Sequence, residues 1–142
     1  MHIATKGSKV DISSEKKLEE FANNLSTKLK KGDIFFLFGE MGVGKTTFVK
    51  YLINNLQNIS KNNLTEVTSP TFNIMNEYNI GNLLIKHYDL YRLKSFNELQ
   101  GLNLFDEKDK AILLIEWPQI IKEKPNLVTK LYFEYDNDYQ NR

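Results

Sequence analysis

The stretch GEMGVGKTT, residues 39–47, constrains the fold of this 142-residue chain more than any other feature. It contains the P-loop pattern G-x4-G-K-[ST] and directly follows the unbroken apolar run IFFLF, residues 34–38. Such a run is typical of a strand that is buried on both faces. After the loop, Phe48, Leu52 and Leu56 recur at helical spacing. A strand, a glycine-rich loop and a helix, in this order, are the setting that a phosphate-binding loop requires.

This setting predicts a site for nucleotide phosphates. Glycines let the backbone wrap closely around phosphate oxygens, and the following helix adds the positive end of its dipole. Lys45 can reach the β and γ phosphates as a point charge, and the Thr46 hydroxyl is placed to bind Mg²⁺. The predicted binding segment consists of Gly39, Glu40, Met41, Gly42, Val43, Gly44, Lys45, Thr46 and Thr47.

A second acidic group is needed on a neighbouring strand, to hold Mg²⁺ directly or through water. The run AILLIEW, residues 111–117, predicts a buried strand with Glu116 near its end. Glutamate reaches one methylene further than the usual aspartate, so Glu116 could bind the metal or polarise the attacking water. The alternative is a carboxylate that caps a helix or meets a lysine. Asp106, Glu107 and Asp109 form a charged run that we expect to be solvated.

Residues 71–93 carry the signal of a β-hairpin. Apolar and polar residues alternate on both sides of Gly81 and Asn82, which supply a two-residue turn. With that turn, Ile80 pairs with Leu83, and the rest of the register follows.

Continuing this register pairs Ile74 with Asp89 and Thr71 with Arg92, far from the turn. Ser69, Thr71, Asp89 and Arg92 therefore gather at this end as a polar cluster that could face the γ-phosphate like a switch segment. Simple turn chemistry around the Ser-Pro-Thr sequence is the alternative.

His87 shares a strand face with Asp89. We expect His87 to be a hydrogen-bonded strand residue and not a ligand, since no partner histidine or cysteine pair suggests zinc. Tyr88, Tyr91 and Phe72 are expected to pack in the protein interior.

The remaining patterns complete an α/β fold. An amphipathic helix is predicted from Ser13 or Ser14 to Gly32, a short capped helix at Ser95 to Glu98, and a last strand within residues 127–136. Strands that alternate with helices predict a three-layer P-loop NTPase-like domain. Its sheet should be mixed and mainly parallel, flanked by helices and completed by the antiparallel hairpin.

Composition narrows the functional classes. The net charge of +1 gives no field that could hold nucleic acid by phosphate neutralisation alone. The absence of cysteine excludes disulfides and thiolate zinc sites. No apolar run predicts a signal peptide or a membrane span, so we expect a cytoplasmic protein. Residues 1–142 are expected to form one P-loop ATPase domain, monomeric when alone, with a frayed tail at about 137–142.

Four motifs together resemble the TsaE (YjeE) family. In chain order they are GEMGVGKTTF, TSPTF, HYDLYRL and IEWP, and the resemblance covers about residues 10–135. It implies an accessory P-loop ATPase that binds ATP and Mg²⁺ and supports N6-threonylcarbamoyladenosine (t6A) formation at adenosine 37 of tRNA. The implied partners are TsaD and TsaB, with tRNA contacted only indirectly through the complex.

The resemblance also implies residue roles. Lys45 and Thr46 would bind phosphate and Mg²⁺, and Thr71 would belong to a switch-like segment. Asp89 would be a required acid, and Glu116 the carboxylate on the metal side. Trp117 would lie near the nucleotide or the partner surface.

Three other functions remain open. A small-molecule kinase would use the same loop, but such enzymes usually supply arginines and a lid, and Arg92 is the only internal arginine. A GTPase is disfavoured because no N-K-x-D-like guanine reader is present. A nucleotide-gated interaction module with negligible turnover would need the loop but little catalysis.

Overall fold

The computed structural model describes residues 2–5 and 8–135. The expectation of a frayed tail at about 137–142 therefore lies outside the described residues. Within the described ranges the chain forms seven strands, three α-helices and one short 3-10 helix. These elements are β1 (His2–Thr5), β2 (Ser8–Asp11), α1 (Glu15–Ser26), β3 (Ile34–Phe38), α2 (Lys45–Ile59), β4 (Met75–Ile80), β5 (Leu83–Asp89), α3 (Phe96–Gln100), β6 (Ala111–Glu116), η1 (Pro118–Ile120) and β7 (Thr129–Glu134).

All seven strands belong to one sheet with the order β2-β1-β7-β3-β6-β5-β4. The central strands β7, β3, β6 and β5 run parallel, and antiparallel pairs complete the sheet at both edges. The hairpin β4–β5 has the predicted register, in which Ile80 pairs with Leu83. The mixed α/β sheet is therefore confirmed, with its parallel part at the centre.

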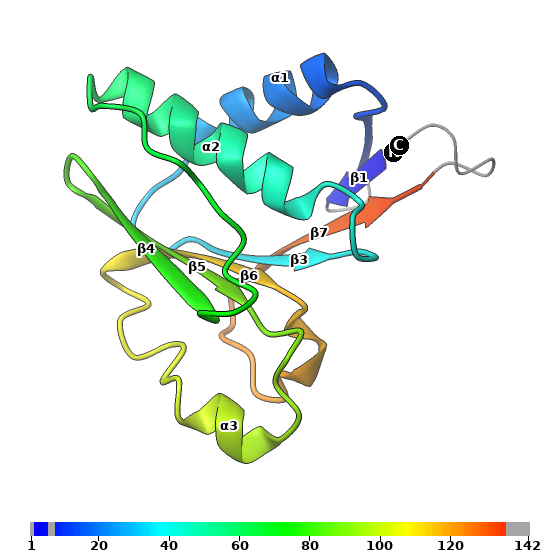
Figure 1. The fold of residues 1–142 in the computed structure, drawn as a ribbon, viewed down its shortest axis with the longest axis vertical. Helices are drawn as coiled ribbons and strands as arrows, with labels where there is room; N and C mark the ends of the chain where they lie inside the picture. The colour runs from blue at the N-terminus through cyan, green and yellow to red at the C-terminus, as the bar shows by residue number, and fades with distance from the viewer. Residues whose placement is uncertain (1, 6–7, 136–142) are drawn as a thin grey trace.

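Helices and loops cover both faces of the sheet (Figure 1). Helices α1 and α2 lie on one face, and α3 and η1 lie on the other. In β3, Phe35 and Leu37 pack in the core cluster on the α1–α2 side, whereas Ile34 and Phe36 belong to the opposite cluster. Burial on both faces explains why β3 reads as an unbroken apolar run.

One expectation needs correction, and two strands were not foreseen. The predicted first helix ends at Ser26 and not at Gly32, because side chains near its end satisfy backbone groups in non-helical turns. Thr27 Oγ1, for example, donates to Asn24 O, and the Asp33 carboxylate accepts from Lys30 N. Strands β1 and β2 were not predicted; each has four residues, and β1 pairs with the edge of β7. Strands so short carry too little alternation to be recognised.

The topology brings the predicted site residues to one level of the sheet. Leu37 of β3 pairs with Glu116 of β6, and Glu116 pairs with Asp89 of β5. All three strands are parallel, so their carboxyl ends meet at the same edge, where ligands bind in open α/β sheets. Among the described residues no helix is long and apolar enough to cross a membrane.

Candidate functional site

The glycine-rich loop is fixed by close backbone contacts. Gly39 has φ +152°, and a Cβ atom at this position would lie 2.8 Å from the carbonyl oxygen of Phe133 and 2.9 Å from a Val43 methyl carbon. Only glycine fits such an approach without displacing β7 or the loop. The buried Val43 side chain anchors the middle of the loop in the core. Gly44, with φ +114°, then starts helix α2.

The Lys45 side chain folds back toward the start of the glycine-rich loop. Its Nζ atom donates to Gly39 O at 2.6 Å and lies 3.9 Å from the centroid of the Trp117 ring. Its side chain is nearly inaccessible, and this desolvation lowers the pKa of Lys45 below its usual value, while the Glu116 and Asp89 carboxylates oppose the shift. The Lys45 side chain thus lines the cavity, and its ammonium group bonds to Gly39 O.

Thr46 and Glu116 meet across 70 positions of sequence. The Thr46 hydroxyl Oγ1 lies 3.2 Å from Oε2 and 3.4 Å from Oε1 of Glu116. A hydroxyl and a carboxylate are hard oxygen donors of the kind that Mg²⁺ prefers. Among residues 2–5 and 8–135 no group of three or more His, Cys, Asp or Glu could hold a metal. Two protein ligands suit Mg²⁺, which commonly keeps waters and takes its remaining ligands from phosphates.

The Glu116 carboxylate has a second buried partner, the side chain of His87. His87 Nε2 lies 2.6 Å from Glu116 Oε2, and the two side chains are 0% and 3% exposed. The expectation that His87 is a hydrogen-bonded strand residue is confirmed. Sequence reasoning placed His87 beside Asp89 but did not identify its partner, because Glu116 lies on another strand 29 positions away.

Asp89 organises the opposite side of the site. Its Oδ2 atom accepts from the Thr71 hydroxyl at 3.2 Å, and its Oδ1 atom accepts from Tyr91 N at 3.0 Å. The Ser69 and Thr71 hydroxyls are 2.6 Å apart. The predicted gathering of Ser69, Thr71 and Asp89 is thus observed.

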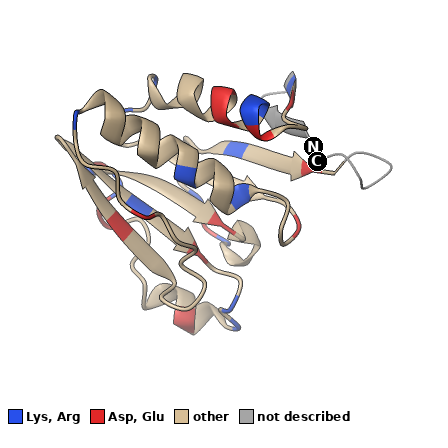
Figure 2. Ribbon diagram, turned by 45° about the horizontal axis from the view of Figure 1, so that its top comes forward, with Lys and Arg blue, Asp and Glu red and all other residues tan. Residues whose placement is uncertain are grey.

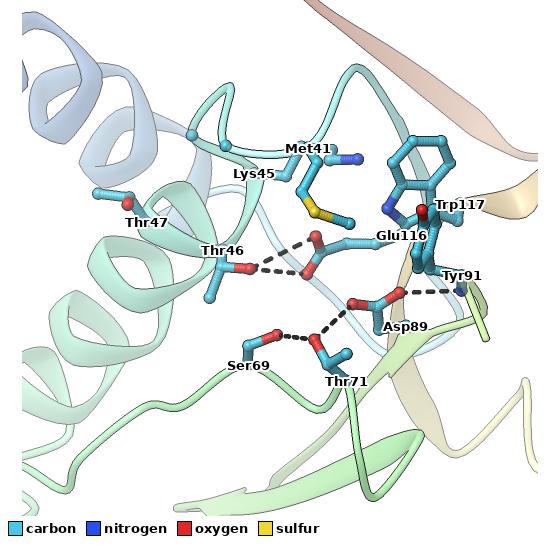
Figure 3. Close-up of a pocket in the computed structure, with 12 residues that line it drawn as sticks. Met41, Lys45, Thr46, Thr47, Ser69, Thr71, Asp89, Tyr91, Glu116 and Trp117 are labelled. Carbon is cyan, nitrogen blue, oxygen red and sulfur yellow. Dashed lines mark hydrogen bonds between the residues drawn. The ribbon is translucent and has the colours of Figure 1, made fainter.

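These groups surround a cavity of about 240 Å³ (Figure 3). Among the predicted residues, Lys45, Thr46, Asp89 and Glu116 all line it, as do Thr71 and Trp117. The complete lining consists of Met41, Gly42, Gly44, Lys45, Thr46, Thr47, Ser69, Thr71, Asp89, Tyr91, Glu116 and Trp117. Three residues of the predicted binding segment, Gly39, Glu40 and Val43, do not line the cavity.

Some side chains lie elsewhere than expected. The Arg92 guanidinium does not join the polar cluster; it lies 5.1 Å from the centroid of the Phe72 ring. Phe72 is 83% exposed and does not pack in the interior, whereas Tyr88 is buried as expected. Tyr91 is half exposed, lines the cavity and contacts Trp117 with ring centroids 4.9 Å apart. Strand β5 ends at Asp89, and the hydrogen bond from Tyr91 N to Asp89 Oδ1 turns the chain there, so Tyr91 and Arg92 do not continue the hairpin register.

Two non-glycine residues with left-handed backbone flank the site. Trp117, directly after Glu116, has φ +55°, and Ile74, at the end of the segment that carries Thr71, has φ +69°. This conformation is unfavourable for a β-branched residue such as Ile74. Ile74 is held there by its N–H, which donates to Pro70 O, and by its carbonyl, which accepts from Asp89 N. Strain of this kind tends to occur at functional sites.

Charged residues show no large single-sign field. Figure 2 shows acidic and basic positions interspersed over the described ribbon, in line with the net charge of +1. Among the described residues, Lys45 is the one Lys or Arg that lines the cavity. The cavity therefore has a single cationic side chain in its lining.

Comparison with known proteins gives consistent matches. The family model described as "Threonylcarbamoyl adenosine biosynthesis protein TsaE" matches residues 12–142. A protein named "tRNA threonylcarbamoyladenosine biosynthesis protein TsaE" from Rickettsia typhi is 40% identical over 111 residues, which cover 78% of this chain and 74% of the relative. The protein of the same name from Borreliella burgdorferi is 41% identical over 114 residues, 78% of each chain.

A more distant relative with that name, from Bacillus subtilis, is 38% identical over 96 residues; these cover 67% of this chain but only 56% of the relative. The crystal structure of YdiB from Bacillus subtilis superposes with a TM-score of 0.61 at 24% identity, covering 96% of this chain and 82% of that one. At this identity the superposition supports the fold.

Proposed function

Because the chain belongs to the TsaE family of tRNA threonylcarbamoyladenosine biosynthesis, we propose that it binds and hydrolyses Mg-ATP in support of that pathway. The proposal rests on one observation above all. Lys45 and Thr46 at the start of α2 and Glu116 on β6 come from segments 70 positions apart, yet they line one cavity. A P-loop ATPase needs these groups together to bind phosphates and Mg²⁺.

Each residue has a defined task in this proposal. The backbone of the loop and Lys45 bind the β and γ phosphates, for which Lys45 Nζ leaves or shares its bond with Gly39 O. Thr46 and Glu116 supply oxygen ligands to Mg²⁺, which would neutralise phosphate charge. Asp89 and Thr71 face the same cavity and would orient the attacking water or the γ-phosphate.

Because the cavity has a single cationic side chain, we expect ATP hydrolysis to depend on partner proteins. Transition states of phosphoryl transfer carry charge on three equatorial oxygens, and a second cation commonly stabilises them. Arg92 lies over the Phe72 ring and does not line the cavity, so it does not supply this charge in the present arrangement. We therefore propose slow hydrolysis by the isolated chain and faster hydrolysis with TsaD and TsaB. The same position of Arg92 gives little support to a small-molecule kinase.

The decisive experiment measures Mg-ATP hydrolysis by the purified chain, alone and with TsaD–TsaB, beside the variant Lys45→Ala. We expect turnover that the partners stimulate and the variant lacks. Tight ATP binding without stimulated turnover would instead support a nucleotide-gated interaction module, for which hydrolysis is incidental. The absence of ATP binding would reject both readings.

A further inference from the structure

The buried contact between His87 and Glu116 has no task in the ATPase scheme described above. His87 lies on β5, where it pairs in register with Leu114, two residues before Glu116 on β6. The glutamate side chain therefore leans back along the strand to place Oε2 at 2.6 Å from His87 Nε2. An aspartate, one methylene shorter, would lack this reach.

The hydrogen-bond roles follow from the chemistry of the two groups. An ionised carboxylate only accepts hydrogen bonds, so Nε2 of His87 must carry the proton and donate it. The second ring nitrogen, Nδ1, is buried and has no hydrogen-bond partner among the described residues. A proton on Nδ1 would lack an acceptor, which favours the tautomer that donates to Glu116. The histidine thus points one donor at one carboxylate oxygen.

The contact leaves the other carboxylate oxygen free for a ligand. Within the described part of the chain, Glu116 Oε1 has only the long 3.4 Å contact with the Thr46 hydroxyl. The hydrogen bond from His87 to Oε2 restricts rotation of the carboxylate. Its remaining lone pairs then face Thr46 and the cavity. Groups that hold a metal ligand in this way commonly matter nearly as much as the ligand itself.

We propose that His87 is a positioning residue, which orients the Glu116 carboxylate so that Glu116 and Thr46 can share a Mg²⁺ ion. This inference rests on the proposed nucleotide site. Loss of this orientation should weaken Mg²⁺ binding and spare phosphate binding, whereas a general loss of structure would weaken both. Without the histidine donor, the protein keeps its phosphate loop but loses the preformed metal ligand.

Three variants of the full chain test the proposal. His87→Leu removes the donor at similar size, whereas His87→Gln keeps an amide N–H near the position of Nε2. Lys86→Met is the matched control; it breaks the neighbouring 2.8 Å ion pair of β5 with Glu107 and touches neither Glu116 nor the cavity. Binding of a non-hydrolysable ATP analogue is measured by calorimetry, without Mg²⁺ and over a Mg²⁺ titration.

For His87→Leu we expect the Mg²⁺ concentration that half-saturates the tightening of analogue binding to rise by about 10- to 100-fold. Binding of the Mg²⁺-free analogue should stay close to that of the wild type. His87→Gln should restore most of the Mg²⁺ response, and Lys86→Met should behave as the wild type. If His87→Leu does not fold, His87→Gln and His87→Asn decide the same point, since the asparagine amide falls short of Glu116.

A wild-type Mg²⁺ response in His87→Leu would overturn the inference and leave the proposed function intact. Equal loss of Mg²⁺-free binding in the leucine and glutamine variants would show a merely structural role and would also overturn it. A wild-type protein that binds no nucleotide analogue would reject the proposed function, and the positioning role with it.

Discussion

The two walls of the cavity are built in different ways. The wall formed by residues 39–47 joins β3 directly to α2 and is anchored by buried Val43 and by the close approach of Gly39 to β7. The opposite wall lies in residues 60–74, a connection without helix or strand that includes 57% exposed Leu64 and 83% exposed Phe72. The second wall is anchored in the core at buried Val67 and at Pro70, but most of its other residues are exposed, so burial fixes the first wall more closely than the second.

Side-chain hydrogen bonds hold the second wall. Gln57 Nε2 donates to Thr65 Oγ1 at 2.8 Å, and Asn76 Nδ2 donates to Thr68 O at 3.1 Å. The Thr71 hydroxyl completes the set through Asp89. Each such bond contributes only about 0.5–1.5 kcal/mol of net stability. The comparison indicates that the wall of residues 39–47 is preformed and that the wall of residues 60–74 is the more adjustable one.

The largest expected effect concerns the preformed wall. Lys45→Ala should raise the Kd for ATP by about 100-fold or more, since two charge-assisted hydrogen bonds to phosphate contribute about 1.5–3 kcal/mol each. Calorimetry with a non-hydrolysable ATP analogue in the absence of Mg²⁺ measures this loss without turnover, and unchanged thermal unfolding would exclude misfolding. Nearly wild-type affinity in the variant would mean that phosphate is not bound at this loop.

The carboxylates should affect catalysis and not the binding of Mg²⁺-free nucleotide. For Glu116→Ala and Asp89→Ala we expect Mg-free ADP binding to persist while ATP turnover falls by about 100-fold, the usual contribution of a group that orients or accepts a proton. Steady-state phosphate release with partners present provides the measurement. Equal hydrolysis by the wild type and Glu116→Ala would remove Glu116 from the mechanism.

A stability measurement tests how rigid the preformed wall is. Gly39→Ala should lower the free energy of unfolding by about 1–3 kcal/mol, because its Cβ would clash with the Phe133 carbonyl oxygen and its backbone would be strained. Gly101→Ala is the matched control, with its Cβ at an ordinary 3.5 Å from Glu98 O. Urea denaturation of both variants decides the point, and equal stability would argue against a tightly fixed loop.

The smallest effect should appear in the adjustable wall. Hydrogen exchange of residues 65–72 should slow severalfold when Mg-ATP or the partners bind, since ordering adds contacts to exposed backbone. Lys45→Ala serves as the control, because it should show no response to Mg-ATP alone. Exchange that ignores both ligand and partners would contradict a switch-like role for Thr71.

The sequence alone determined the features that depend on neighbouring residues. The glycine loop between β3 and α2, the Ser14 cap of α1 and the Ser95 cap of α3 all follow from local patterns and are observed. The hairpin register follows from the turn at Gly81, which sets every pair up to Asp89. These features are encoded over a few residues, where propensity and periodicity act directly.

Only the tertiary structure decided which distant side chains meet. The contact between His87 and Glu116, the position of Lys45 under Trp117 and the place of Arg92 over Phe72 all join residues from different segments. The strand β1 likewise required the edge of β7 as its partner. Such contacts depend on strand order and on the path of loops after each strand, which no local pattern specifies.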